Sequence, residues 1–222
     1  MRRIILVCVL LVLFSSTAFG FEIDERVFEF EEEWIDVSIT LPQVEGENEL
    51  LVEAINTVFR GYSILQAEVL RQYAKDTYMS SLEEEFSYFP SSGFSFISGY
   101  NVRHHNDKYL SITQYIYEFT GGAHGMTFLV SVNVDVEKQE FIHTIGDLDI
   151  REDYYQFILE EINRQIEADN PEVYWLPVTE FDITNFYLTP DGLGIFFQLY
   201  SIAPYSTGIS EFIIPWELLV KE

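Results

Sequence analysis

The chain has 222 residues, 37 of them acidic and 12 basic, so that its formal net charge is −25. Hydrophobic residues make up 48% of the sequence, which excludes an intrinsically disordered chain. The negative charge argues against nucleic acid and anionic lipid as partners, and it favours a cationic protein or divalent cations. The same charge also suits an exported protein whose surface only has to stay soluble, and composition does not separate these two interpretations.

The first residues have the pattern of a secretory signal peptide. Two arginines precede an unbroken apolar run over residues 4–14, and Ala18 and Gly20 supply the small residues that a signal peptidase requires. We expect cleavage after Gly20 and a periplasmic or secreted protein without a membrane span. An uncleaved anchor is the alternative, although the run is only about half as long as a bilayer-spanning helix. The only cysteine, Cys8, would leave with this segment, and the net charge would change from −25 to −27 because two arginines are lost.

Apolar periodicity predicts the elements of an N-terminal part, residues 21–92. Residues 26–41 alternate like a strand or a bent pair of strands, because the alternation changes parity at the acidic run 31–33. Asn48 is a suitable cap for a long helix that extends to about Tyr78. One apolar stripe along this helix is expected to face the core. Its members are Leu51, Ile55, Val58, Tyr62, Leu65, Val69 and Tyr73.

The C-terminal part, residues 93–222, has mainly strand patterns. An antiparallel meander is predicted over residues 94–145, a second helix from Glu152 to about Ala168, and short strands after it. We therefore predict an α+β fold in two sub-domains: an antiparallel sheet with one long N-terminal helix and a second helix packed on it.

The most distinctive stretch is Tyr117–Gly125, YEFTGGAHG, between two strands of the meander. The adjacent Gly121 and Gly122 suggest backbone angles that are closed to residues with a Cβ. His124 has two interpretations. In one it is a metal ligand or general base beside nearby carboxylates. In the other its ring nitrogens hydrogen-bond loop carbonyls and hold the connection, and this is favoured because no second ligand follows at metal spacing.

Tyrosines on the strand before this connection are candidates for a binding surface. Tyr109, Tyr115 and Tyr117 lie on the opposite strand face from the apolar residues between them. Exposed tyrosines are favourable contact residues at interfaces. The sequence has no paired-histidine zinc motif, no serine nucleophile elbow and no glycine-rich phosphate loop, so we expect no metal and no cofactor.

Tyr117–Gly125 resembles the signature of an extracytoplasmic bacterial family. This family includes the RsiV-type lysozyme-sensing anti-sigma factors and the accessory domain of PdaC-type peptidoglycan deacetylases. The pair Asn133 and Asp135, the dipeptide Asp147-Leu148 and an Ala-Pro-Tyr turn that ends at Tyr205 are similar to further parts of the family pattern.

The resemblance implies a PdaC-like part over residues 21–92 and an RsiV-like part over residues 93–222, after a signal peptide at 1–20. It also implies a set of ligand-binding residues. They are Tyr117, Thr120, Gly121, Gly122, His124, Gly125, Asn133, Asp135, Asp147 and Tyr205.

Two functions from different classes follow. The first is a non-enzymatic binding module of the bacterial envelope that recognises a cationic protein, such as lysozyme, or a peptidoglycan ligand. The second is a hydrolase of envelope polymers that uses His124 and nearby carboxylates. The surroundings of His124 distinguish the two: an open cleft with a second titratable group favours the hydrolase, and bonded ring nitrogens favour the binding module.

Overall fold

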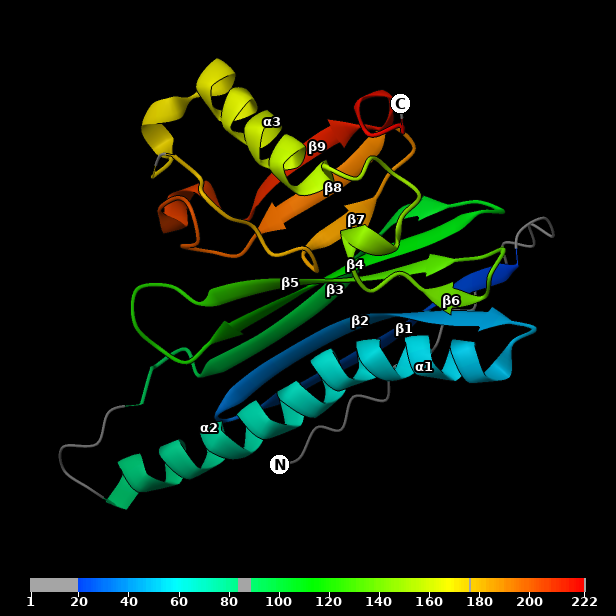
Figure 1. The fold of residues 1–222 in the computed structure, drawn as a ribbon. Helices are drawn as coiled ribbons and strands as arrows, with labels where there is room; N and C mark the ends of the chain where they lie inside the picture. The colour runs from blue at the N-terminus through cyan, green and yellow to red at the C-terminus, as the bar shows by residue number, and fades with distance from the viewer. Residues whose placement is uncertain (1–19, 84–88, 176, 222) are drawn as a thin grey trace. The chain divides into compact units, whose positions relative to one another are not determined.

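The computed structural model describes residues 20–83, 89–175 and 177–221 of the chain (Figure 1). Except for Gly20, the predicted signal peptide lies outside the described residues, so its cleavage stays a prediction. Within the described ranges, none of the helices is long and apolar enough to cross a membrane.

The chain folds into two compact units. The first unit comprises the residues up to Tyr100 together with Gln114–Thr127. The second unit comprises Asn101–Thr113 and the chain from Phe128 onward. The domain boundary predicted after residue 92 stays a prediction.

The fold is α+β, as predicted, with a six-stranded sheet of order β1-β2-β3-β4-β5-β6 and a three-stranded sheet of order β7-β8-β9. The elements are β1 (Phe21–Glu32), β2 (Ile35–Gly46), α1 (Glu49–Arg60), α2 (Gln66–Glu83), β3 (Phe94–His105), β4 (Tyr109–Phe119), β5 (Met126–Asp135), β6 (Glu140–Phe141), α3 (Tyr154–Asp169), β7 (Phe186–Leu188), β8 (Gly192–Phe197) and β9 (Ser210–Pro215).

The larger sheet is mixed rather than purely antiparallel. β2 runs parallel to β3, with register pairs from Ile35↔Phe94 to Ile39↔Ser98. The physical reason is the connection between them: the long helix carries the chain back along the sheet, and such a crossover joins parallel neighbours. β1 and β2 form an antiparallel hairpin that closes at Glu32↔Ile35, so the change of parity marks a turn between two strands rather than a bulge.

The long helix begins as predicted. The side-chain oxygen of Asn48 accepts a hydrogen bond from the backbone N–H of Leu51 at 3.2 Å, and Leu51 and Ile55 are buried. At Gly61–Leu65 the helix forms a π-helical turn that separates α1 from α2. A π turn closes with i→i+5 hydrogen bonds and therefore takes up more residues than an α turn.

The π turn changes which residues of α2 face the core. The predicted members Tyr62, Leu65, Val69 and Tyr73 are 41%, 64%, 64% and 58% exposed, so this part of the predicted stripe is wrong. The buried positions run later in the sequence because the π turn delays the helix register. Beyond the turn they are Ala67, Leu70 and Ala74, whereas Phe59 and Ser63 are buried before and within the turn.

A buried polar cluster occupies the π turn. The hydroxyl of Ser63 lies 2.7 Å from the hydroxyl of Ser98 on β3, and it accepts a hydrogen bond of 2.6 Å from the side-chain amide of Gln114 on β4. All three side chains are buried. The cluster therefore ties the π turn to the two central strands of the first unit's sheet.

Replacing Ser63 by alanine tests this tie. Ser63→Ala leaves the hydrogen-bonding atoms of Ser98 and Gln114 buried with a lost partner, and we expect it to lower the free energy of unfolding by about 1–3 kcal/mol. Ser80→Ala, at an exposed position of α2, is the matched control and should change stability by less than about 0.5 kcal/mol. Urea unfolding of both variants measures the difference, and equal stabilities would contradict the tie.

The second unit has its own core between α3 and the three-stranded sheet (Figure 1). Ile158, Ile162 and Ile166 lie on one side of α3, in the same buried cluster as Phe186 and Leu193 of the sheet. The helix predicted from Glu152 to about Ala168 is therefore present and packs by its apolar side.

A partly exposed ion pair lies beside this core. The Nε of Arg103 donates to the hydroxyl of Thr113 at 2.8 Å, and its Nη2 donates to a carboxylate oxygen of Glu211 at 3.0 Å. The guanidinium also lies 4.4 Å from the ring centre of Tyr187. Burial and the neighbouring Glu211 carboxylate raise the pKa of Tyr187, so its phenol stays neutral. No sequence motif indicated this cluster.

Candidate functional site

The connection between β4 and β5 has the backbone that its two glycines predicted. Gly121 has a φ of 104° and Gly122 a φ of 93°, in the region that side chains with a Cβ rarely adopt. The predicted positive φ is therefore confirmed. A Cβ on Gly122 would have open space around it, so the backbone angle alone favours glycine at this position.

Two other glycines allow tyrosine rings to lie against the sheet. A Cβ on Gly125 would lie 2.5 Å from Cζ of Tyr117, and a Cβ on Gly99 would lie 2.6 Å from Cζ of Tyr115. Such distances are impossible for real side chains, so each ring of β4 covers a glycine of a neighbouring segment. Within the motif Tyr117–Gly125, the last glycine therefore makes room for the ring of the first tyrosine.

These tyrosines share one side of the first unit's sheet, which we call the outer face. The opposite side packs on the long helix, because Ser98 and its register partner Ile39 point there and Ser98 contacts Ser63. Side chains alternate along each strand, and the register pairs assign the remaining positions. The outer face consists of Glu25, Val27, Glu29, Glu31, Asp36, Ser38, Thr40, Ser95, Ile97, Gly99, Tyr115 and Tyr117.

The outer face is acidic at its edge and apolar farther in. β1 is an edge strand, and its carboxylates on this face are exposed. Register pairs align Glu29 with Ser38 and Ser38 with Ile97, so one row runs from a carboxylate through a hydroxyl to an apolar side chain. Ile97 is 41% and Tyr115 38% exposed. None of the outer-face positions holds Lys, Arg or His.

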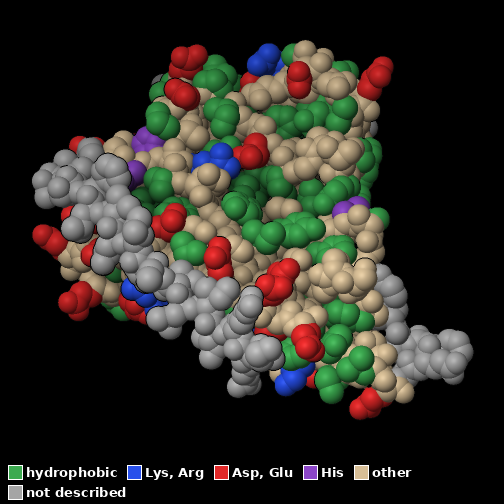
Figure 2. All heavy atoms as spheres, turned by 180° about the vertical axis from the view of Figure 1, so that it is seen from behind, with side chains coloured by type: hydrophobic (Ala, Val, Ile, Leu, Met, Phe, Trp, Pro, Cys, Tyr) green, Lys and Arg blue, Asp and Glu red, His purple; other side chains and the backbone are tan. Residues whose placement is uncertain are grey.

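The space-filling view from behind shows acidic side chains among hydrophobic ones and few basic ones (Figure 2).

The prediction of an exposed tyrosine is confirmed for Tyr115, and Tyr117 is partly buried. Tyr109 belongs to the second unit, where the Lys108 amine lies 4.9 Å from its ring centre.

His124 is exposed at the end of the connection, and its Nδ1 lies 2.9 Å from the carbonyl oxygen of Gly125. This is a contact of the kind that the loop-holding interpretation predicted. Glu118, the motif carboxylate in the same unit, is partly buried, and burial raises its pKa. Among the described residues, no three or more His, Cys, Asp and Glu side chains are grouped to hold a metal ion. That the protein needs no cofactor stays a prediction.

Asn133, Asp135, Asp147 and Tyr205 lie in the second unit, and Asn133 is buried there. Its side-chain oxygen accepts from the hydroxyl of Ser111 at 2.6 Å, and its amide donates to the carbonyl of Phe186 at 3.0 Å. The same Ser111 hydroxyl accepts from the backbone N–H of Leu188 at 2.9 Å. Asn133 therefore joins β4 and β5 to β7 within this unit.

The two motif aspartates hold turns. Asp135 accepts the backbone N–H of Lys138 at 2.9 Å and lies 2.8 Å from its amine. Burial alone would raise the pKa of Asp135, but the Lys138 hydrogen bonds outweigh burial and lower it. Asp147 accepts the backbone N–H groups of Thr144 and His143 at 2.8 and 3.0 Å. These bonds, the Thr144 backbone bond first, lower the pKa of Asp147.

Thr120 is exposed, and Tyr205 opens a short 3₁₀ turn with its ring centre 5.9 Å from that of Tyr200. The structure thus divides the motif residues between the two units and gives several of them local structural partners. Their role in binding a ligand stays a prediction. Residues of the outer face outside the motif, such as Glu29 and Ile97, were not indicated by the sequence, because only strand pairing places them beside the tyrosines.

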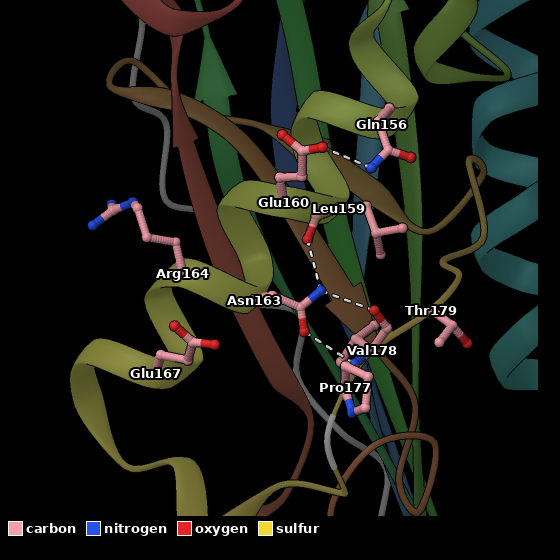
Figure 3. Close-up of a pocket in the computed structure, with 9 residues that line it drawn as sticks. All are labelled: Gln156, Leu159, Glu160, Asn163, Arg164, Glu167, Pro177, Val178 and Thr179. Atoms are coloured by element: carbon pink, nitrogen blue, oxygen red, sulfur yellow. Dashed lines mark hydrogen bonds between the residues drawn. The ribbon is translucent and has the colours of Figure 1, made fainter.

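The second unit also has a groove of about 450 Å³ between α3 and residues 177–179 (Figure 3). Asn163 holds its two walls together: its amide donates to the carbonyl of Val178 at 2.8 Å, and its oxygen accepts the N–H of Val178 at 3.0 Å. Glu160 accepts from Gln156 at 2.8 Å, as the close-up shows (Figure 3). The polar atoms of Asn163 bond the protein's own backbone. Asn163 therefore has a structural role at the groove, which is to hold residues 177–179 against α3.

Two regions of the chain match known protein families. Residues 28–127 match the family described as deacetylase PdaC, and residues 147–217 match DUF3298, a family of unknown function. The chain therefore carries a PdaC domain followed by a DUF3298 domain. The resemblance inferred from the glycine-histidine motif is confirmed.

Solved structures of DUF3298 proteins share the fold. A Bacteroides fragilis member is 17% identical, with a TM-score of 0.69 over 91% of this chain and 93% of that one. A Pseudomonas aeruginosa member is 20% identical, with a TM-score of 0.59 over 91% of this chain and 94% of that one. No curated protein matches the chain in sequence.

The glycine connection can be tested without changing any packing contact. Gly122→Val places a β-branched residue at a φ of 93° in open space, so its cost is the backbone strain alone. We expect a loss of about 1–3 kcal/mol in the free energy of unfolding. Gly61→Ala, at helical angles and also in open space, is the matched control and should stabilise by about 0.5–1 kcal/mol. Equal effects of the two substitutions in chemical denaturation would refute the strain argument.

The lowered pKa of Asp147 predicts a pH dependence of stability. The pKa in the folded chain lies below the usual 3.8. The stabilising contribution is therefore full above that value and is lost as the pH falls through the folded pKa. Asp147→Asn should thus reduce stability at about pH 6, and its difference from the wild type should narrow at about pH 3. The exposed Asp107→Asn is the control, and a difference that stays constant with pH in urea unfolding would contradict the assignment.

Proposed function

We propose that this is an exported bacterial envelope protein whose first unit acts as a non-enzymatic binding module for a cationic protein. The outer face carries the proposal. It presents exposed Ile97 and Tyr115 beside a row of carboxylates on β1, and none of the positions that define the face in the described first unit holds a basic side chain. Apolar and aromatic side chains supply affinity at an interface, and a rim of one charge steers a partner of the opposite charge.

The geometry of the tyrosines supports an interface. Tyr115 and Tyr117 lie against glycines, so their rings are already ordered and lose little side-chain entropy when a partner covers them. Carboxylates on an edge strand also prevent pairing with other sheets. That protective role accounts for charge on β1, but it does not account for exposed Ile97 and Tyr115 in the middle of the sheet.

The class of partner follows from charge, and one candidate follows from the family resemblance. A mature chain of net charge −27, once two arginines are removed from −25, attracts cationic proteins. The resemblance to a lysozyme-sensing module makes a C-type lysozyme the partner to test first. A peptidoglycan ligand is the alternative, and the hydrolase hypothesis receives no geometric support from the contacts of His124.

Calorimetry with the mature protein tests the proposal. Lysozyme is titrated in parallel with a non-homologous protein of similar positive charge, at low and at physiological salt. Specific recognition predicts that lysozyme binding survives physiological salt and exceeds that of the control protein. Equal affinity for both proteins, or binding to sedimented peptidoglycan alone, would remove the cationic protein as the ligand.

Mass spectrometry of exported protein checks the export: we expect Phe21 at the N-terminus, and a retained Met1 contradicts cleavage.

Variants locate the binding surface. Ile97→Gln should weaken lysozyme binding by about tenfold, and Glu29→Lys should mainly slow association and reduce its salt dependence. Ile213→Gln and Glu172→Lys are the matched controls, because Ile213 is 37% exposed and both residues belong to the second unit. If the control variants weaken binding as much as the outer-face variants, the outer face is not the site.

A further inference from the structure

The π turn leaves an apolar stripe of α2 in solvent. Leu65, Val69 and Tyr73 follow one another at i, i+4 and i+8, so they lie side by side on successive turns of the helix. They are 64%, 64% and 58% exposed. Single exposed apolar residues are common on proteins, but a contiguous stripe marks an interaction surface more often. We call these three residues the α2 stripe.

The core of the first unit uses the α2 stripe only at its end, where the ring centre of Tyr73 lies 5.7 Å from that of Phe94 on β3. The face of α2 that packs on the sheet is formed by Ala67, Leu70 and Ala74, which are at most 7% exposed. In an uninterrupted α-helix the stripe would continue the buried positions Leu51 and Ile55. The π turn has turned Leu65 and Val69 outward, and the apolar character of these two residues has no explanation in the packing of the described residues. Distortions of this type occur frequently at functional sites.

The charges beside the stripe indicate the chemistry of what covers it. Of the two bases of α2, Arg71 contacts Glu32 at 3.1 Å and Glu68 at 2.8 Å, and the exposed Lys75 has its amine 6.0 Å from the ring centre of Trp34. Glu68 remains 57% exposed despite its ion pair.

Asp76 is also exposed, and it lies one α turn beyond the stripe at i+3 from Tyr73. The stripe is therefore apolar with an acidic margin. A partner that complements the α2 stripe must have an apolar side with basic residues along its edge.

We propose that the α2 stripe binds a cationic amphipathic helix of a partner. Its apolar side packs on Leu65, Val69 and Tyr73, and its basic residues face Glu68 and Asp76. Helices dock on such surfaces through apolar anchors about one helical turn apart, and the side chains of the stripe at i, i+4 and i+8 are also about one turn apart. The stripe is separate from the outer face, since α2 packs on the other side of the sheet. The proposal is therefore independent of the function proposed above.

The probe is a synthetic peptide of leucine and lysine, about 18 residues or five helical turns long, with leucine at helical spacing. A second peptide has the same composition in strictly alternating order, so it carries the same charge without a helical apolar side. Fluorescence anisotropy with the mature full chain measures both at physiological salt. We expect the helical peptide to bind and the alternating peptide to bind at least about tenfold more weakly.

The double variant Leu65→Gln/Val69→Gln identifies the surface. It should weaken binding of the helical peptide by at least about tenfold. Because both side chains are exposed, the melting temperature should shift by no more than about 2 °C, which shows that the fold is intact. The matched control is Leu50→Gln/Val220→Gln, which makes the same chemical change at residues that are 83% and 64% exposed elsewhere. This control should bind like the wild type.

Three results would overturn the proposal. The first is undetectable binding of the helical peptide to the wild type. The second is binding that the double variant leaves unchanged, because the peptide would then be held elsewhere by the net charge. The third comes from sedimentation of the protein alone: if the wild type self-associates and the double variant is monomeric, a second copy of the chain covers the stripe instead of a cationic helix.

Discussion

The first unit depends on a buried polar contact at the π turn of its long helix. The hydroxyl of Ser63 is held between Ser98 and Gln114, all of them buried, and leaving such groups unpaired is costly. Bringing Ser63 to the sheet requires the helix to take up additional residues in one turn, and this resets every side chain that follows. The packing of α2 through Ala67, Leu70 and Ala74, and the exposure of Leu65 and Val69, follow from this change of register.

The long helix also determines the direction of the strands in the first unit's sheet. Because a helix connects β2 to β3, these strands are parallel, and the remaining strands follow as hairpin neighbours on each side. One side of the strands is committed to the helix and the other is left as the outer face. Glycines 99 and 125 let two tyrosine rings of β4 lie against this face. The side chains proposed to bind a partner then lie on regular strands, which hold side chains more rigidly than loops do.

Much of the architecture could be predicted from local sequence signals. Strand alternation, the Asn48 cap and the double glycine each act over a few residues, and the structure confirms the α+β class, the helix start and the positive φ at Gly121 and Gly122. The family signature could be recognised for the same reason, because its residues are contiguous. Part of that signature is structural: Asn133 and Asp147 each hydrogen-bond groups of the second unit.

The sequence by itself determined the charge, the export signal pattern, the order of most elements and the residues with unusual backbone angles. Only the tertiary structure decided which face each side chain occupies. Helical periodicity placed Leu65, Val69 and Tyr73 in the core, but a hydroxyl that needed a partner on β3 and β4 shifted the register and exposed them. The outer face likewise depends on cross-strand register, which joins residues about 70 positions apart in the chain, such as Glu29 and Ile97. Contacts of that range leave no local pattern in a single sequence.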